Sequence, residues 1–383
     1  MARARSGSAV EKGLKFFIYG SEGTWKSSLS LEFMEMKTTE GRPLRVLYID
    51  CETGSVDNYL EDLEKKGINL DNLYIVYTPS YDEVEYYANK AINNEDFFVL
   101  DDEGNETDDI VKDADGNPFR PDAIVIDGIT VVADNVKMAA INISEKRAGI
   151  RAKINQSTAE EKQVAIETAG LEFKDHDKIK SKGKILIRNL ITNTDKYVAI
   201  TGRDKPEKIM QKDNKNQMQL VDTGKRIPES WEFIKYEVFT VLHNFIDETG
   251  TVNAQIENKD RTKVYSQNEI VSEPSLLVWQ KVIDSNKGKS KSLVQEDYKK
   301  SLARDEKMYE QADKDTTDDT PESPKEFTTI DEYIDAINKA FDKMSPTKKK
   351  SLKPLVAKEG LPIDYKSLTD LDTIKKFYEV VTK

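Results

Sequence analysis

Cysteine is nearly missing from this sequence, with Cys51 the one thiol in 383 residues. One thiol excludes an intramolecular disulfide framework, the device that stabilises many small secreted domains. Long apolar runs are missing too: none approaches the roughly 20 residues that cross a bilayer, and no apolar segment stands at the N-terminus. We therefore expect a soluble, cytoplasmic protein that makes no contact with membranes.

Positive charge is in deficit as well. Lysine and arginine number 58 against 70 aspartates and glutamates, which gives a formal net charge of −12. This balance argues against a surface coated in basic residues, so any contact with nucleic acid must come from local basic segments. At 37% hydrophobic and 33% charged residues the chain is globular but highly charged. Its length predicts two units, since single cores stop growing at roughly 250–300 residues.

The most informative stretch is an apolar run, 14–19, that stops at Gly20 and is followed six residues later by Lys26 and Ser27. We interpret it as a strand, a phosphate-binding loop and the start of a helix, because the backbone N–H groups of such a turn face an anion. Lys26 would reach the phosphates of a nucleotide, and the Ser27 hydroxyl would bind Mg²⁺. The predicted nucleotide-binding residues of the loop are Gly20, Ser21, Glu22, Gly23, Thr24, Trp25, Lys26, Ser27 and Ser28.

One position departs from the pattern G-x-x-x-x-G-K-[ST], because Trp25 stands where the second glycine is expected. A strand, a glycine turn and a helix with a chance Lys-Ser pair is the alternative interpretation of this stretch. The rest of the chain favours the phosphate loop, since it supplies acidic partners at the ends of further predicted strands.

Two more apolar strands, 45–50 and 122–127, end in acidic residues. Parallel strands covered on both faces have this composition, and their carboxyl ends form the edge where open α/β sheets bind ligands. At that edge Glu52 could orient or deprotonate an attacking water, although a helix cap or a solvated acid is an equal alternative. Asp127 would hold Mg²⁺ opposite Ser27, directly or through water. The two motifs in this order predict a site for ATP and Mg²⁺.

Strands and helices alternate through most of the chain, which predicts a wound, mostly parallel sheet. The alternation breaks at 97–120, where turn signals predict an inserted two-stranded hairpin, and at 134–184, where long polar stretches predict exposed helices. The strand 197–201 then brings Thr201 and Arg203 to the nucleotide edge, where they are suited to sensing the γ-phosphate.

The segment 204–223 is rich in lysine and is expected to be a mobile loop. Its side chains could contact the phosphate backbone of single-stranded DNA without sequence preference, and a solvated surface loop is an equal alternative. The candidate DNA-binding residues are Lys205, Lys208, Lys212 and Lys215.

From residue 236 onward the pattern becomes antiparallel, with two strands, 236–245 and 251–258, joined by a glycine turn. The second strand ends in Lys259 and Arg261, one position apart, which would point the same way from an extended backbone. They could reach a nucleotide bound by an adjacent subunit and compensate charge as phosphate transfers. The alternative is a turn with exposed charges.

The C-terminal part divides into a linker and a small module. Residues 291–326, rich in acids, Thr, Ser and Pro, are expected to form a disordered acidic linker. Residues 327–383 carry apolar stripes at helical spacing and predict a small all-α domain with one basic helix. That helix could touch nucleic acid or an acidic partner, although a solvated face is the simpler interpretation. At the other end, residues 1–13 form a short, flexible tail.

Five segments together resemble the core of RecA-like ATPases, and in particular the phage ATP-binding proteins of the Sak type, which act in single-strand annealing recombination. The segments are Gly20 to Ser27, Ile49 to Glu52, Val125 to Thr130, Ile200 to Arg203 and Asn258 to Arg261. The resemblance covers about residues 14–283 and implies a RecA-like P-loop core over 14–290.

The resemblance also implies a role for each of the quoted motifs. It implies a Walker A loop that ends at Ser27, a Walker B aspartate at Asp127 and a catalytic glutamate at Glu52. It further implies a sensor near Thr201 and Arg203, and DNA binding by 204–223. Lys259 and Arg261 would then form a finger that acts across the subunit interface of a ring or filament.

The expected function is a Mg²⁺-dependent ATPase that acts on single-stranded DNA in recombination or replication, in the cytoplasm of the host cell if a phage encodes it. Two alternatives stay open: a scaffold protein that binds ATP with little turnover, and a helicase or packaging motor, since the same core drives all of them. The C-terminal module could bind a single-strand binding protein or a recombination protein.

Overall fold

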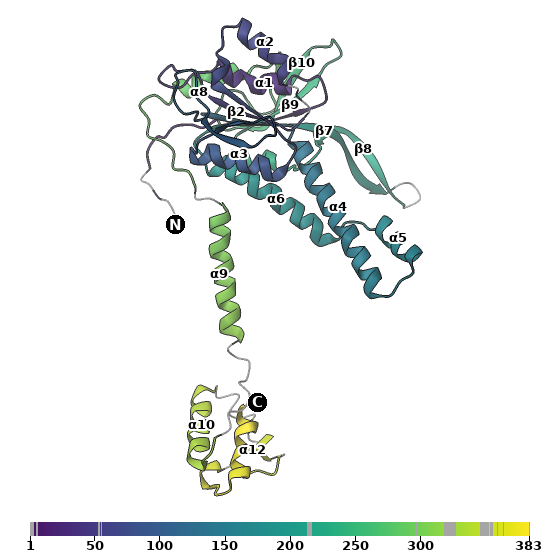
Figure 1. Ribbon diagram of the computed structural model, residues 1–383, viewed down its shortest axis with the longest axis vertical. Coiled ribbons are helices and arrows are strands. Elements are labelled where there is room, and N and C mark those ends of the chain that lie inside the picture. Colours follow the sequence, from purple (N-terminus) through teal and green to yellow (C-terminus); the bar gives the residue numbers. More distant parts are fainter. Residues whose placement is uncertain are drawn as a thin grey trace. The chain divides into compact units, whose positions relative to one another are not determined.

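A nine-stranded sheet dominates the described part of this computed structural model, in the order β11-β10-β9-β1-β7-β6-β2-β3, with β8 paired to β7 (Figure 1). Strands β9, β1, β7, β6, β2 and β3 run parallel, whereas β8, β10 and β11 pair antiparallel. Their bounds are β1 (Lys15–Gly20), β2 (Val46–Asp50), β3 (Leu73–Tyr77), β6 (Ala123–Asp127), β7 (Tyr197–Lys212), β8 (Met218–Pro228), β9 (Thr240–Ile246), β10 (Val252–Asp260) and β11 (Ile270–Ser272). The predicted fold class, α/β with a mostly parallel sheet and an antiparallel extension, is confirmed.

The structure describes residues 4, 7–52, 54, 56–212, 217–295, 298–317, 327–344, 352, 355–357, 359–362 and 364–382. Contacts between the elements divide the chain into two units, Met1–Ser301 and Leu302–Lys383. The sheet and the candidate site belong to the first unit.

Successive residues of the central strands face opposite sides of the sheet, and both sides are buried. In β6, Ile124 and Ile126 belong to one hydrophobic core, whereas Ala123 and Val125 belong to the other. This double burial is the reason the strands are continuous apolar runs in the sequence. Each fully buried Ile or Val side chain contributes about 1.5–3 kcal/mol of hydrophobic stabilisation.

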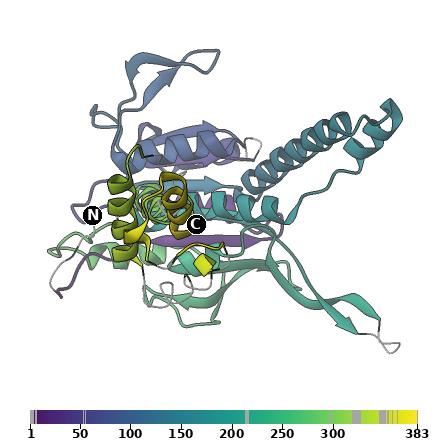
Figure 2. The same cartoon turned by 90° about the horizontal axis from the view of Figure 1, so that it is seen from below.

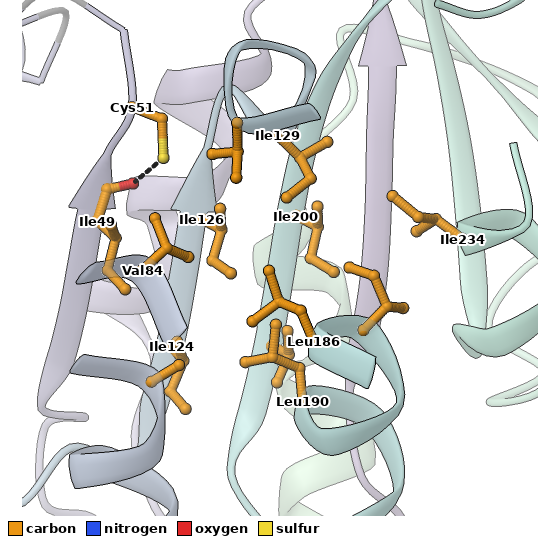
Figure 3. Close-up of a cluster of buried hydrophobic side chains, with 14 of the residues drawn as sticks. Ile49, Cys51, Val84, Ile124, Ile126, Ile129, Leu186, Leu190, Ile200 and Ile234 are labelled. Atoms are coloured by element: carbon orange, nitrogen blue, oxygen red, sulfur yellow. Dashed lines mark hydrogen bonds between the residues drawn. The ribbon is translucent and has the colours of Figure 1, made fainter. Parts of the chain in front are cut away.

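Three helices cover one face of the sheet: α3 (Tyr81–Asn93), α4 (Ile129–Ile154) and α6 (Phe173–Thr192). Figure 3 shows Leu186 and Leu190 of α6 and Val84 of α3 against strand residues of this core. The opposite core contains side chains of α1 (Lys26–Leu31), η1 (Glu32–Glu35), α2 (Asp57–Lys65), η3 (Leu276–Trp279) and α8 (Gln280–Asp284). The short elements η2 (Leu70–Asn72) and α7 (Ile234–Glu237) also belong to the first unit.

Three elements extend from this core (Figures 1 and 2). The C-terminal part of α4 extends away from the sheet together with α5 (Ala159–Glu167). This part of α4 carries exposed residues such as Ile154. Strands β4 (Phe98–Leu100) and β5 (Glu106–Ile110) form a separate two-stranded sheet inside the segment 97–120. The distal halves of β7 and β8 form a long hairpin beyond the edge of the main sheet.

Two expectations about irregular segments are wrong. The lysine-rich segment 204–223 is not a mobile loop, because 204–212 continue β7 and pair with β8; the tip, 213–216, lies outside the described residues. The expected disordered linker contains helix α9 (Tyr298–Thr317), while 318–326 lie outside the described residues. Contacts that are distant in sequence anchor the start of α9: the Arg188 guanidinium donates to the Tyr298 hydroxyl at 2.9 Å, and Lys299 pairs with Glu85 at 2.8 Å.

The second unit holds a small helical core. Its elements include α10 (Ile330–Lys343), η4 (Tyr365–Ser367) and α12 (Leu371–Thr382), and its fully buried residues include Tyr333, Ile337, Ile374 and Phe377. Most of the predicted basic helix, including Lys348, lies outside the described residues. Among the helices that the structure describes in either unit, none has the length and apolar character to span a bilayer.

Candidate functional site

The carboxyl ends of the parallel strands bring the predicted site residues to one edge of the sheet. Gly20 at the end of β1 is level with Arg203 on β7 and with Asn244 on β9. Asp50 at the end of β2 is level with Asp127 at the end of β6. Since Ile126 is level with Ile200, Asp127 and Thr201 are also neighbours across the strands. Five segments that are far apart in the sequence therefore meet at this edge.

The predicted phosphate loop, 20–28, has a left-handed residue, Trp25, at the position where the pattern expects a glycine. Trp25 has φ 61° and ψ 20°, in the left-handed region that costs a residue with a Cβ roughly 1–2 kcal/mol. Trp25 is 44% exposed, so much of the residue faces solvent. Trp25 thus adopts the backbone conformation that glycine favours.

Gly20 is required by close packing rather than by its dihedral angles. A Cβ added there would lie 2.2 Å from the carbonyl oxygen of Asn244, a distance that backbone atoms do not tolerate. Asn244 is itself buried, and its side-chain amide donates to the Thr24 carbonyl at 2.8 Å. Strand β9 therefore packs directly against the loop and hydrogen-bonds to it through Asn244.

Within the loop, the Ser21 carbonyl is the common acceptor. It accepts a 2.7 Å hydrogen bond from the Thr24 hydroxyl and another of 2.7 Å from the Lys26 ammonium. Burial lowers the pKa of Lys26, and the charges of Glu52, Asp127 and Asp204 oppose this shift. Glu22 is exposed, while Ser27 and Ser28 are partly buried at the start of α1.

Asp127 is almost fully buried and accepts two side-chain hydroxyls. Tyr48 donates to Oδ2 at 2.6 Å, and Thr201 donates to Oδ1. The Gly128 amide in turn donates to the Thr201 hydroxyl at 2.8 Å, which sets the direction of that donor. The structure therefore brings together Thr201 and Asp127, which the sequence placed at the same edge, and adds Tyr48, which the sequence did not single out. A tyrosine inside a fully buried strand was the available signal, because a buried hydroxyl needs a partner.

Glu52 lies beside Asp127 and is held by Arg203. Its Oε1 accepts from the Arg203 guanidinium, at 3.1 Å from Nε and 3.0 Å from Nη2. Gly128, with φ 90°, makes room for it: an added Cβ there would lie 2.5 Å from Cγ of Glu52. Two residues predicted for catalysis thus form an ion pair with each other.

Asp204, the residue after Arg203, is a further site residue that the sequence analysis missed. Its side chain is 1% exposed and accepts from the Ser21 hydroxyl of the phosphate loop at 3.0 Å. An acid inside a lysine-rich segment gave no pattern from which this contact could be predicted.

The predicted finger residues lie at the other edge of the sheet. Asp260 is level with Thr240, which is level with Phe16 at the start of β1, whereas the phosphate loop follows its end. The backbone of Arg261 donates to the Phe239 carbonyl at 3.0 Å, and its guanidinium lies 5.5 Å from the Phe239 ring centroid. Arg261 is therefore remote from the phosphate loop of its own chain. The side chain of Lys259 lies outside the described residues.

The candidate DNA-binding lysines line the β7–β8 hairpin. Lys208 and Lys212 share one face with Met210, and opposite them on β8 stand Asp222, Met218 and Leu220. Lys205 is exposed near the root, and Lys215 lies outside the described residues. The interleaved apolar side chains are well exposed, at 55–65% for Met210, Met218 and Leu220.

Comparison with protein-family models found no match for this sequence, and no curated protein matches it. Among solved structures, the chain is similar to a KaiC-like protein from the hyperthermophilic archaeon Pyrococcus horikoshii. The two share 15% identity over 69% of this chain and 91% of that one, with a TM-score of 0.35. A likeness of that size gives no information about activity.

Proposed function

We propose that the chain is a RecA-like ATPase that binds ATP with Mg²⁺ and couples turnover to single-stranded DNA, in recombination or replication of the phage type. The observation that carries the proposal is the meeting of Lys26, Asp127 and Glu52 at one edge of a parallel sheet, behind a loop that keeps its left-handed turn at Trp25. A phosphate site, a metal-binding acid and a base are the parts that nucleotide hydrolysis requires.

The donor set fits a magnesium nucleotide. Lys26 would exchange its bond to the Ser21 carbonyl for a phosphate oxygen, while Ser27 and Asp127 supply the oxygen ligands that Mg²⁺ prefers. Bound Mg²⁺ supplies positive charge to the phosphates. Tyr48 and Thr201 fix the orientation of the Asp127 carboxylate, so that this ligand needs no rearrangement.

Glu52 would act as the base that orients an attacking water. The Arg203 guanidinium occupies Oε1 of Glu52, so a water that approaches this oxygen must compete with the ion pair. Arg203 would therefore turn from Glu52 to the developing phosphate charge during turnover. The same ion pair favours the second candidate function, a scaffold that binds ATP and turns it over slowly.

The hairpin is the part of the chain suited to single-stranded DNA. Lys205, Lys208 and Lys212 would contact phosphates, and the exposed Met210 and Leu220 offer apolar contact to bases. Such contacts are independent of sequence and sensitive to salt. Lys205, Lys208 and Lys212 place basic groups on one projecting element, which is the local basic segment that a chain with a net charge of −12 needs for contact with nucleic acid.

Assembly into a ring or filament is part of the proposal. Because Arg261 lies at the edge opposite the phosphate loop, it can serve nucleotide chemistry only in an adjacent subunit. A charge donated in trans is worth about 10³–10⁵ in turnover in the best-known phosphoryl-transfer systems.

Nucleotide binding is tested by thermal stabilisation. A ligand at 100 times its Kd stabilises a protein by about 2.7 kcal/mol, and Lys26→Ala should abolish that gain. Lys65→Ala, which removes an exposed lysine on α2, is the matched control and should retain it. Stabilisation that survives in Lys26→Ala would overturn the site assignment.

Phosphate release with and without single-stranded DNA then separates the two candidate functions. Stimulation by DNA supports the DNA-dependent ATPase. Stabilisation by nucleotide without phosphate release supports the scaffold.

A further inference from the structure

Two consecutive residues at the root of the hairpin contact the two halves of the candidate site. Arg203 pairs with Glu52, and Asp204 accepts from Ser21 of the phosphate loop. Successive residues of a strand point to opposite faces, which is how one short segment reaches both partners. The segment belongs to β7, whose distal half is the hairpin.

Asp204 is a buried charge with several donors around it. Arg226 reaches both of its oxygens, with Nη2 at 2.8 Å from Oδ1 and Nε at 2.5 Å from Oδ2, and His243 Nε2 lies 3.3 Å from Oδ2. Burial opposes the charge of Asp204, but the hydrogen bonds from Arg226, Ser21 and His243 outweigh it and lower the pKa of the carboxyl. The group is therefore an ionised anchor beside the phosphate loop.

Arg226 comes from the other strand of the hairpin. Asp204 is opposite Pro228 and Arg226 is opposite Pro206, so the pair joins β7 and β8 diagonally. Side chains from three other segments converge on this one carboxylate of β7: Ser21 from the phosphate loop, Arg226 from β8 and His243 from β9. The Asp204 carboxylate is buried although Arg226 is 41% exposed, so losing Arg226 would leave a buried charge without its main partner.

We propose that Asp204 and Arg226 form a clamp that positions the phosphate loop through Ser21. Through this clamp, conformational ordering at the root of the β7–β8 hairpin and conformational ordering of the nucleotide site favour each other. Asp204 acts here as a positioning residue, since it touches Ser21 and not the nucleotide. By thermodynamic linkage the effect is reciprocal: whatever orders the hairpin root favours nucleotide binding, and nucleotide binding orders the hairpin root. The coupling to nucleotide binding rests on the proposed function, whereas the effect of the clamp on the order of residues 20–26 does not.

The first test needs no nucleotide. Arg226→Gln removes the clamp at a side chain that is 41% exposed, and Lys225→Gln removes the same charge at the neighbouring exposed position. Amide hydrogen exchange over residues 20–26 should accelerate several-fold in Arg226→Gln and stay at the wild-type rate in Lys225→Gln. Equal exchange in the wild type and Arg226→Gln would overturn the clamp.

The second test measures nucleotide affinity by titration. We expect Arg226→Gln to bind about tenfold more weakly, the effect of losing one ordering hydrogen bond, and Lys225→Gln to bind as the wild type does. Arg226→Lys should fall between them, because an ammonium cannot bridge both oxygens of Asp204. Asp204→Asn, which keeps the shape and loses the charge, should weaken binding in the same direction. A loop that loosens in Arg226→Gln with unchanged affinity would overturn the coupling.

The reciprocal effect supplies the third readout. Saturating nucleotide should slow exchange at residues 203–206 and 226–228 in the wild type, and this protection should be lost in Arg226→Gln. Protection that persists in the variant would refute the clamp. If the wild type itself bound no nucleotide, the proposed function would fail, and the exchange of residues 20–26 would still decide whether the clamp exists.

Discussion

Tyr48→Phe tests the buried end of the site with a single atom removed. Tyr48 is fully buried in β2, and its hydroxyl donates to Oδ2 of Asp127 at 2.6 Å. Phenylalanine fills the same volume, so the apolar packing of the ring is retained and only the donor is lost. Burial and the adjacent Asp127 raise the pKa of Tyr48, so the hydroxyl stays protonated and remains a donor at neutral pH.

The magnitude follows from the charge of the acceptor. A hydrogen bond to a charged group contributes about 1.5–3 kcal/mol, and Asp127 retains the hydroxyl of Thr201, so we expect a loss of about 2 kcal/mol in the free energy of unfolding. For a unit of about 300 residues that loss lowers Tm by about 3 °C. Mg²⁺-dependent nucleotide binding should also weaken, because the Asp127 carboxylate loses one of the groups that orient it.

The assay is chemical denaturation of four proteins: the wild type, Tyr48→Phe, Asp127→Asn and the double variant. The double-mutant cycle should show a coupling energy of about 1–2 kcal/mol between the two positions. Tyr59→Phe on α2 is the matched control, since its hydroxyl makes no hydrogen bond to any residue that the structure describes. A Tyr48→Phe protein as stable as Tyr59→Phe, or a coupling near zero, would refute the reasoning.

Three other predictions address the rest of the molecule. Burial lowers the pKa of Lys15 to about 7, whereas the unfolded value is about 10.4, so between these two pH values the unfolded chain binds more protons than the folded chain. The free energy of unfolding of the wild type should therefore rise with pH across this range, and an equal slope in Lys15→Met would count against this explanation. Arg261→Ala should keep ATP binding and lose most ATP hydrolysis. When this variant is titrated into the wild type, activity should fall more steeply than the wild-type fraction, and activity strictly proportional to that fraction would mean that no site is shared between subunits. Replacing Lys205, Lys208 and Lys212 by Gln should reduce the slope of log affinity for single-stranded DNA against log salt by about 2, and an unchanged slope would place DNA binding elsewhere.

The sequence predicted the local structure of those candidate-site segments that depend on neighbours along the chain. The strand, loop and helix from Gly20 to Ser28 form one continuous segment, and Asp127 directly follows an apolar strand, so period and turn chemistry were sufficient. Trp25 shows the limit of such a pattern. The motif was interrupted, yet Trp25 adopts the left-handed backbone conformation that glycine favours.

The hairpin and α9 were mispredicted for a common reason. Polar, charged segments resemble loops when composition alone is considered, but cross-strand pairing with β8 orders 204–212, and contacts to Arg188 and Glu85 anchor α9. Both are tertiary effects that override local preference.

What the sequence by itself determined is the succession of strands along the chain, their burial on both faces and the identity of the groups at their carboxyl ends. Only the tertiary structure decided which of those groups meet. Tyr48 and Asp127 are 79 residues apart, and Ser21 and Asp204 are 183 apart, so their pairing depends on strand order and register across the sheet. The same register sent Arg261 to the opposite edge, because an antiparallel strand returns the chain to the start of β1. A side chain's type is a local property, whereas its partner is set by which strand lies beside it.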